Sequence, residues 1–256
     1  MKCLDIVLRT CDRGPVHPER GPRFIDTDKQ TLIKKCLISL LNSIDQAKHL
    51  ADIKVFVVDD NSVDDTLNYI KNKLVNYNIE HEIIPCEKEG FNYSAVKQFE
   101  VCKEKGRKWV YCVEDDYLHF PEAIKQMLIM SERFENITGN HIAIRPDDDL
   151  FTYSPNSPHS RKTSIILLGD DRHWRTLHNT HNTIFTHVDV FKDYWELFAS
   201  LGKFFKVLSI NEDKSINMIW EKVPLFSPIP TLAIHISQNN EPPFVDYKTL
   251  WNNTPI

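Results

Sequence analysis

The segment that most constrains this fold is the apolar, largely β-branched run Ile53–Val58, which stops at two aspartates. A run dominated by apolar residues, without a regular alternation of polar ones, is typical of a strand buried on both faces. Such a strand needs helices packed on both sides of its sheet. The segment therefore predicts an α/β fold with a central, mostly parallel sheet flanked by helices.

The first 145 residues repeat this strand-then-helix pattern. Short apolar runs alternate with segments whose apolar residues recur at helical spacing, which predicts right-handed βαβ units. Gly106 is expected to end one helix, and Pro121 to lie in the first turn of another. The predicted strands are Leu4–Leu8, Ile53–Val58, Glu82–Pro85, Lys108–Val113 and His141–Ile144, and the predicted helices are Thr31–Ile44, Leu67–Val75, Tyr93–Lys105 and Pro121–Phe134.

After residue 145 the pattern changes, but no segment resembles a linker or a repeat. We therefore expect a single domain over residues 1–256, in which 1–145 and 146–256 form two halves of one fold. A proline-rich turn is expected at Leu225–Pro230, and an irregular tail after Gln238. The other elements expected here are strands at Ser164–Leu168, Arg172–Leu177, Thr183–His187 and Thr231–Ile236, and helices at Val190–Leu201 and Glu212–Glu221.

Composition and charge exclude several classes of protein. Of the 256 residues 41% are hydrophobic and 26% charged, which excludes a disordered or coiled-coil chain. No window holds the roughly 20 apolar residues that span a bilayer. The net charge of −5 argues against a nucleic-acid backbone as the main partner. The six cysteines include no CxxC pair, which favours free thiols in a reducing compartment.

Two groups of carboxylates follow predicted buried strands. Asp59 and Asp60 end one strand, and Glu114–Asp116 follow Lys108–Val113. Ligands of open α/β sheets bind beyond the carboxyl ends of the strands, so these acids mark the candidate site. Packed together they would raise one another's pKa unless a cation neutralised them, and a divalent metal with oxygen ligands is the natural partner. The chain has neither GxGxxG nor GxxxxGK[ST], so dinucleotide and P-loop sites are disfavoured.

These motifs resemble, in their order along the chain, those of the family 2 glycosyltransferases, which have the nucleotide-diphospho-sugar transferase fold called GT-A. Asp59–Thr66 is similar to the family's D-D-x-S-x-D-x-T pattern, and Glu114–Asp116 to its D-x-D motif, with Glu in the first place. The opening strand and turn resemble the family's P-T-Y-N-R segment but carry Arg9 and Cys11 instead of the proline and the tyrosine. Looser resemblances lie at Gly90–Ala95, Arg172–Arg175 with Asn182-Thr183, Asn211–Asp213 and Pro230–His235.

The resemblance implies a role for each matching residue. Asp116 and His235 would bind Mn²⁺ or Mg²⁺, which stabilises the charge of the departing diphosphate. Asp213 would be the general base, with Glu212 as the alternative, and direct displacement would invert the anomeric carbon. The residues that would contact the base, ribose or phosphates of the donor are Thr10, Arg13, Asp59, Asp60, Glu114 and Asp115.

Two further clusters have simpler interpretations. The histidines at 173, 178, 181 and 187 match no standard zinc spacing, so we do not expect a zinc site built from these four. Arg145–Asp149 is expected to be a loop near the acceptor, with its acids solvated. The basic stretch from Gly14 to Arg23 lacks the compact glycine spacing of a phosphate loop.

The function implied by the resemblance is a metal-dependent, inverting transfer of a hexose or deoxyhexose. The donor would be a nucleoside-diphosphate sugar, and the acceptor a hydroxyl of a glycan or lipid-linked glycan. Two alternatives stay open: a sugar-phosphate nucleotidyltransferase, which would release pyrophosphate, and a non-catalytic carbohydrate-binding protein on a degenerate GT-A fold. We expect a cytoplasmic protein, with recruitment to a membrane as a further option.

Overall fold

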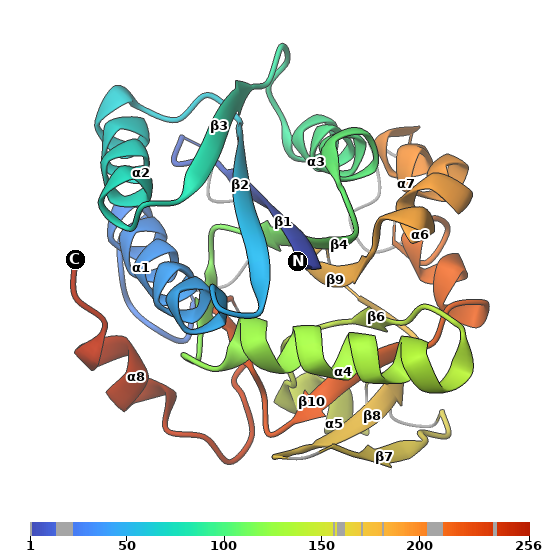
Figure 1. Ribbon diagram of the computed structural model, residues 1–256. Coiled ribbons are helices and arrows are strands. Elements are labelled where there is room, and N and C mark those ends of the chain that lie inside the picture. The colour runs from blue at the N-terminus through green and yellow to red at the C-terminus, as the bar shows by residue number, and fades with distance from the viewer. Residues whose placement is uncertain are drawn as a thin grey trace.

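The computed structural model describes residues 2–13, 23–155, 157, 162–169, 171–180, 182–203, 212–237 and 240–256. Within these ranges a nine-stranded sheet runs through the molecule in the order β3-β2-β1-β4-β9-β6-β10-β8-β7, and a two-stranded sheet pairs β11 with β5. Helices lie on both sides of the large sheet (Figure 1). The α/β fold with a central sheet flanked by helices is therefore confirmed.

The first half of the chain follows the predicted alternation. Every strand and helix predicted before residue 145 is present, and most are longer than predicted. One addition is the short strand β5, which follows β4 directly and pairs with β11. The elements are β1 (Lys2–Thr10), α1 (Lys29–Ala47), β2 (Ala51–Asp59), α2 (Asp64–Asn76), β3 (Glu80–Pro85), α3 (Phe91–Lys105), β4 (Trp109–Glu114), β5 (Tyr117–His119), α4 (Ala123–Thr138) and β6 (Ala143–Ile144).

The second half departs further from the prediction. The expected helix Val190–Leu201 is divided in two, and the expected helix Glu212–Glu221 is a turn followed by a 3₁₀ helix. The elements are α5 (Leu150–Tyr153), β7 (Ile166–Leu168), β8 (His173–Leu177), β9 (Ile184–His187), α6 (Val188–Asp193), α7 (Trp195–Ser200), η1 (Leu201–Lys203), η2 (Ile216–Glu221), β10 (Leu225–Ile229), β11 (Ala233–His235) and α8 (Tyr247–Asn253).

Two predictions in this half are wrong. The expected turn at Leu225–Pro230 is strand β10, which pairs with β6 and β8. Its pairing with β6 ends at Phe226, so the N–H that Pro228 lacks is not needed on that side. The expected irregular tail contains α8, whose N-cap Asp246 accepts a hydrogen bond from the Thr249 amide at 3.0 Å. The Tyr247 ring of α8 packs edge-on against the ring of Phe24, which precedes α1.

The four strands β3, β2, β1 and β4 run parallel, and their two faces enter different cores. Val55 and Val57 of β2 pack on the side of α1, α2 and α4, whereas Phe56 and Val58 pack on the side of α3, α6 and α7. The prediction that the Ile53–Val58 strand is buried on both faces is confirmed. This arrangement fixes the carboxyl ends of the strands at one edge of the sheet.

Helix ends are set by specific residues. The Asp28 side chain accepts from the Thr31 amide at 2.8 Å and caps α1. Gly139, with φ of 69°, ends α4 in the left-handed conformation that glycine tolerates. Gly106 ends α3 as predicted, but for a different reason: its φ is −63°, and a Cβ there would lie 2.6 Å from Val110 Cγ2. Glycine at 106 therefore permits the close approach of α3 to β4.

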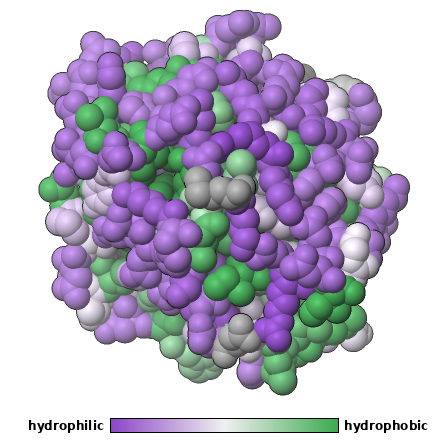
Figure 2. Space-filling view, in the orientation of Figure 1, coloured by the Kyte–Doolittle hydropathy of each residue, from purple (hydrophilic) through white to green (hydrophobic). Residues whose placement is uncertain are grey.

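The surface in Figure 2 is mostly hydrophilic. A hydrophobic patch at its lower right lies where Figure 1 shows β7, near the exposed side chains of Ile165, Ile166 and Leu168. None of the six cysteines, all of which lie in the described residues, forms a disulfide, as predicted. Among the described residues, no helix is both long and apolar enough to cross a membrane.

Candidate active site

The carboxyl ends of β1, β2 and β4 carry most of the residues predicted for donor binding. Across β1 and β2, Thr10 pairs with Asp59, and across β1 and β4, Arg9 pairs with Glu114. Asp59 and Glu114 are far apart in the sequence, but both lie at the same edge of the sheet, on either side of β1. Because β1 is the middle strand of the three, its last residues contact the acids of both neighbours.

Each acid of the turn Glu114–Asp116 faces its own cation. The Arg9 guanidinium forms an ion pair with Glu114. Lys29 Nζ lies 2.5 Å from Asp115 Oδ1, and His235 Nε2 lies 3.5 Å from Asp116 Oδ2. Burial opposes the charge of Arg9 and of Lys29, but the acids of this turn outweigh burial and raise the pKa of both cations. The positive charges of Arg9 and Lys29 thereby offset the negative charge that this turn gathers.

Sequence reasoning missed the two long-range cations. Arg9 was noticed only as a departure from the family pattern, and its guanidinium also lies over the Phe91 ring, 4.6 Å from the centroid. Lys29 is the first residue of α1 and reaches Asp115 across 86 positions. Nothing in the local sequence signals either pairing, because both depend on how β1 and α1 approach β4.

Thr10 and Asp115 hold the turn to the end of β1. The Thr10 hydroxyl donates to Asp115 Oδ2 at 3.3 Å, and the Cys11 amide donates to the same oxygen at 2.9 Å. Thr10 is buried, so its side chain secures the acidic turn. Arg13, also predicted for the donor site, is exposed at the end of the same segment.

Asp59 and Asp60 order the loops beside the site. Asp59 accepts from the Ser62 amide at 3.1 Å, and Asp60 accepts from the Gly90 amide at 3.2 Å. Both side chains are buried. Burial, together with the neighbouring carboxylates of Asp12 and Asp60, raises the pKa of Asp59, although its bonds from Ser62 act in the opposite direction. The pair predicted to line a base pocket therefore orders the loops beyond the end of β2.

The predicted metal ligands are Asp116, which directly precedes β5, and His235, the last residue of β11. Their side chains lie in contact. Burial opposes the charge of Asp116, but His235, Lys29 and Arg9 overcome it and lower its pKa. Burial likewise opposes the charge of His235, yet Asp116 raises its pKa overall. The His235 ring also stacks on the Tyr117 ring with centroids 4.6 Å apart.

The chemistry of this pair fits a divalent ion. Asp116 Oδ1 is buried and has no hydrogen-bond partner in the described part of the chain. A carboxylate and an imidazole together suit Mn²⁺ better than Mg²⁺. The side-chain nitrogen of Asn240 lies 2.8 Å from His235 Nδ1, so this residue, not singled out in the sequence, orients the imidazole. The neighbour Ser237 accepts from the same amide group at 2.9 Å.

Asp213 and Glu212, the predicted bases, lie in a turn that precedes η2. Asp213 is exposed, and Asn217 Nδ2 donates to its Oδ1 at 2.8 Å. The Glu212 carbonyl accepts from the amides of Ser215 and Asn217. Asn211, part of the matching motif, lies outside the described residues.

A hydrogen-bonded path leads from Asp213 to the acidic turn. Asn217 Oδ1 accepts from the Thr180 amide at 2.9 Å, and the Thr180 hydroxyl donates to the Thr183 carbonyl at 3.3 Å. The Thr183 hydroxyl in turn accepts from the Glu114 amide at 3.2 Å. Asn217 was not singled out from the sequence, where its only signal is helical spacing from Asp213.

The expectation that the acids of Arg145–Asp149 are solvated is wrong. Arg145 is buried and forms ion pairs with Asp147, at 3.0 Å, and with Asp149. Arg175 Nη2 lies 2.5 Å from Asp148 Oδ1. Burial raises the pKa of Asp147 and of Asp148, although the arginines act in the opposite direction. The acids are buried because arginines from this segment and from β8 compensate them, which a local charge pattern does not reveal.

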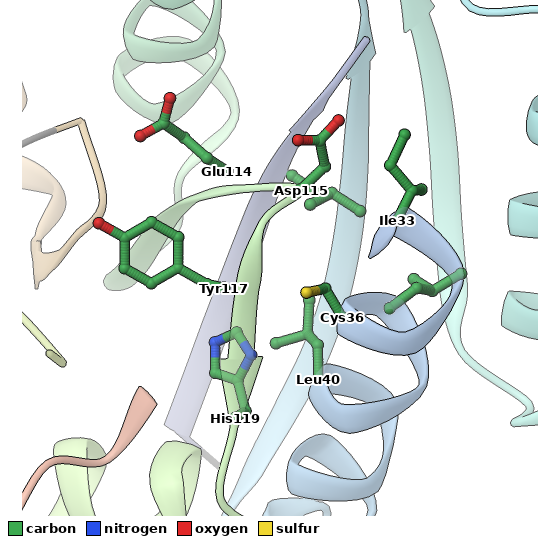
Figure 3. A pocket seen from close by; sticks show the side chains of 9 residues that line it. Ile33, Cys36, Leu40, Glu114, Asp115, Tyr117 and His119 are labelled. Atoms are coloured by element: carbon green, nitrogen blue, oxygen red, sulfur yellow. The ribbon is translucent and has the colours of Figure 1, made fainter. Parts of the chain in front are cut away.

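One cavity lies beside the acidic turn, and another lies beside Arg175. Beneath Asp115, a cavity of about 10 Å³ between α1 and β4–β5 has room for about one water molecule. Figure 3 shows the carboxylates of Glu114 and Asp115 pointing away from Cys36 and Leu40 of its lining, so it is a packing void and not a donor pocket. A second cavity, of about 140 Å³, lies in the second half beside Arg175.

Of the four histidines for which no zinc site is expected, His181 lies outside the described residues. The stretch from Gly14 to Arg23 is described only at Arg23. His173 is exposed and His178 lines the larger cavity. His187 lies at the end of β9, beside the start of β4 and away from the acidic turn.

Comparison with known proteins gives a consistent result. Residues 28–195 match the model of the family described as glycosyl transferase family 2. A comparison with curated proteins found no match.

Solved structures share the fold at low sequence identity. S. aureus TarS 1-349 matches with a TM-score of 0.52 and 16% identity over 89% of this chain and 60% of that one. The same protein in complex with UDP-GlcNAc matches with a TM-score of 0.51, 15% identity and coverage of 89% and 58%. GalNAc-T7 with UDP, GalNAc and Mn²⁺ matches with a TM-score of 0.57, 12% identity and coverage of 94% and 45%. This chain thus spans less than two thirds of these proteins, and the likeness confirms the expected GT-A fold.

Proposed function

This chain belongs to glycosyl transferase family 2, and from that premise we propose that it transfers a sugar from a nucleoside-diphosphate sugar to an acceptor hydroxyl with metal assistance and inversion. The observation that carries the proposal is the Asp116–His235 pair at the end of the acidic turn, with one buried carboxylate oxygen left without a hydrogen bond in the described residues. The solved neighbours include one complex with UDP-GlcNAc and one with UDP and Mn²⁺.

Asp116 and His235 would hold the ion, and the bound ion supplies Lewis-acid stabilisation of the diphosphate leaving group. Glu114 and Asp115 form ion pairs with Arg9 and Lys29, and these ion pairs would hold the turn in place for the donor. The two ion pairs also reduce the repulsion that Glu114 and Asp115 would otherwise exert on an anionic donor.

Asp59 and Asp60 would border the nucleoside, because they end β2 and order the adjoining loops. Thr10 supports the site from β1, and the exposed Arg13 is available for a phosphate or base contact. We assign residues 1–145 to the donor and residues 146–256 to the acceptor.

Asp213 would remove the proton from the acceptor hydroxyl as that oxygen attacks the anomeric carbon. Because the acceptor oxygen attacks from the side opposite the departing diphosphate, the configuration at the anomeric carbon would be inverted. Asn217 would position the Asp213 carboxylate through its 2.8 Å hydrogen bond. Glu212 is the competing candidate for the base.

We further propose that the transferred sugar is a hexose, and that the acceptor is a glycan or lipid-linked glycan. The larger cavity beside Arg175 and His178 lies in the half assigned to the acceptor and can admit part of such a molecule. The six free thiols favour a reducing compartment such as the cytoplasm.

Binding is tested by thermal unfolding with UDP, GDP, dTDP or CMP, each with Mn²⁺ or EDTA. Ligand at about 100 times its Kd adds roughly 2.7 kcal/mol, which raises the Tm by roughly 5 °C for a chain of this size. We expect one nucleotide to give a Mn²⁺-dependent shift that Asp116→Ala abolishes. If none of the four gives such a shift, metal-dependent donor binding is wrong.

Catalysis is tested by the release of nucleoside diphosphate from a panel of nucleotide sugars with glycan acceptors. Asp213→Asn should bind nucleotide as the parent does and lose about 10²–10⁴-fold in turnover. Glu212→Gln is the matched control and should retain most of the activity. If the Asp213→Asn variant transfers sugar as fast as the parent, Asp213 is not the base. A separate assay with a sugar phosphate and NTP tests the alternative function, because release of pyrophosphate would identify a nucleotidyltransferase.

A further inference from the structure

A second group of metal-ligating side chains lies at the other end of the sheet. Candidate ligand atoms of Glu135, His141 and His187 all lie within 4.8 Å of one another. His187 pairs in register with Trp109, the first residue of β4, whereas the acidic turn begins at Glu114, the last residue of β4. The group is therefore separated from the donor site by the length of a core strand.

Rigid elements hold these residues. Glu135 lies in the last turn of α4, which Gly139 ends, and His141 lies two residues before β6. β6 and β9 are antiparallel neighbours, with Ala143 opposite Thr186, so the sheet brings His141 close to His187, the last residue of β9. A site on strands and a helix end is more precisely placed than one on loops.

The two imidazole rings lie face to face. Their centroids are 3.9 Å apart and their planes differ by 2°. His141 Nδ1 lies 3.4 Å from Glu135 Oε1, too far for a good hydrogen bond, and this buried nitrogen has no hydrogen-bond partner in the described ranges. A buried polar atom without a partner is costly, so an occupant that uses its lone pair is favoured.

A fourth side chain borders the group. Asp189 Oδ2 lies 3.3 Å from His187 Nδ1 and 3.9 Å from His141 Nε2. Lys108 Nζ lies 2.9 Å from Glu135 Oε2, which leaves Oε1 of that carboxylate directed at His141. Two imidazoles and two carboxylates within one small volume form a donor set that binds Zn²⁺ and neighbouring transition metals better than Ca²⁺ or Mg²⁺.

We propose that Glu135, His141 and His187 form a transition-metal site of the zinc class, with Asp189 beside it as a fourth ligand or as the group that orients an imidazole. In the parallel stack the nitrogen lone pairs lie in separate planes, so the rings tilt toward each other when the ion binds. All three ligands are half-buried, which leaves the ion a path from solvent. The bound ion ties the end of α4 to β6 and β9.

The test titrates purified protein with Co²⁺ and then displaces it with Zn²⁺. The background variant is Asp116→Ala, which removes the metal pair of the proposed donor site. In this background we expect one equivalent of Co²⁺ with visible d–d absorption that Zn²⁺ abolishes. Adding His141→Gln or His187→Gln should weaken Co²⁺ binding at least tenfold, since each removes a ligand.

His49→Gln is the matched control, because His49 is exposed at the end of α1 and should leave the affinity unchanged. Glu135→Gln, which preserves the size of the side chain, serves as a second variant if a histidine change impairs folding as judged by circular dichroism. Failure of the Asp116→Ala protein to bind Co²⁺, or unchanged affinity in folded variants of His141, His187 and Glu135, would overturn the proposal.

Discussion

His119 of β5 is a histidine that burial keeps neutral, and we expect it to make the protein sensitive to acid. Its side chain is 2% exposed, its Nε2 lies 2.8 Å from Tyr111 Oη, and its backbone amide donates to Ser39 Oγ at 2.9 Å. Burial lowers the pKa of His119 from 6.5 to about 3, and a backbone bond at Tyr117 opposes this only weakly.

The sign and size of the effect follow from this pKa. In the unfolded chain His119 takes up a proton near pH 6.5, but in the folded protein only near pH 3. Between these values the unfolded state binds more protons, so the stabilisation is complete above pH 6.5 and is lost as the pH falls toward 3. At about 1.36 kcal/mol per pKa unit, the free energy of unfolding falls by about 3 kcal/mol from pH 6.5 to 4 and by about 4 kcal/mol from pH 6.5 to 3.

Urea unfolding at pH 7, 5.5 and 4 measures this loss in the parent protein and in His119→Gln. The parent should lose about 3 kcal/mol more than the variant between pH 7 and pH 4. The difference between the two proteins cancels the carboxylates, including Asp59 and Asp147, whose raised pKa values act in the opposite direction. His49→Gln, at an exposed histidine, should follow the parent. Parallel pH profiles for the parent and His119→Gln would refute the reasoning.

Three further changes test other parts of the structure. Arg145→Met leaves Asp147 buried without its cation and should cost about 3–5 kcal/mol in urea unfolding, whereas parental stability would mean that the acids are not held as ions. Asn240→Leu should weaken Mn²⁺ binding in the presence of UDP by about 10–100-fold in calorimetry, with Asn240→Asp less affected, and equal affinities would show that Asn240 does not orient His235. Gly106→Ala should cost roughly 1–3 kcal/mol, because its Cβ would clash with the backbone oxygen of Cys102 and with a Val110 methyl, and an unchanged Tm would contradict the close packing.

The sequence sufficed for the first half of the fold because each element there has a strong local signal. Ile53–Val58 reads as a strand from its own residues, and Thr31–Ile44 reads as a helix from its own spacing. Alternation of such elements leaves few topologies, because βαβ connections are right-handed. Element ends were less certain, as the helix α4 begins at Ala123 and not at Pro121.

The second half depends on partners that are distant in the chain. The segment of β10 contains Pro228 and predicts a turn when it is considered alone, yet β8 supplies a distant antiparallel partner, in which Trp174 pairs with Pro228. The short helix α8 has few apolar residues of its own and forms against α1, where Lys35 Nζ contacts the Trp251 carbonyl at 2.9 Å. Local patterns carry no information about such contacts, so these elements were misassigned.

The candidate site divides in the same way. Asp116 and His235 could be paired from the sequence because the family resemblance connected them, and they lie in contact in the structure. Asn217 and Asn240 could not be found, because an asparagine is informative only when its neighbours in space are known. The His141–His187 stack was missed for a related reason: the four-histidine spacing included His187 but not the partner that β6 brings to it.

The structure also changes the argument for a metal. From the sequence, the ion seemed necessary because the consecutive acids Glu114–Asp116 would repel one another. In the structure Arg9 and Lys29 form ion pairs with the first two acids, so repulsion within the turn does not by itself require an ion. Within the turn, Asp116 has one buried oxygen without a hydrogen-bond partner in the described residues, and its other oxygen lies 3.5 Å from His235 Nε2. Asp116 and His235 alone would not complete the coordination of Mn²⁺, and in the proposed function the donor's diphosphate would supply further oxygens. On that proposal, ion and nucleotide should each strengthen the other's binding by the same factor.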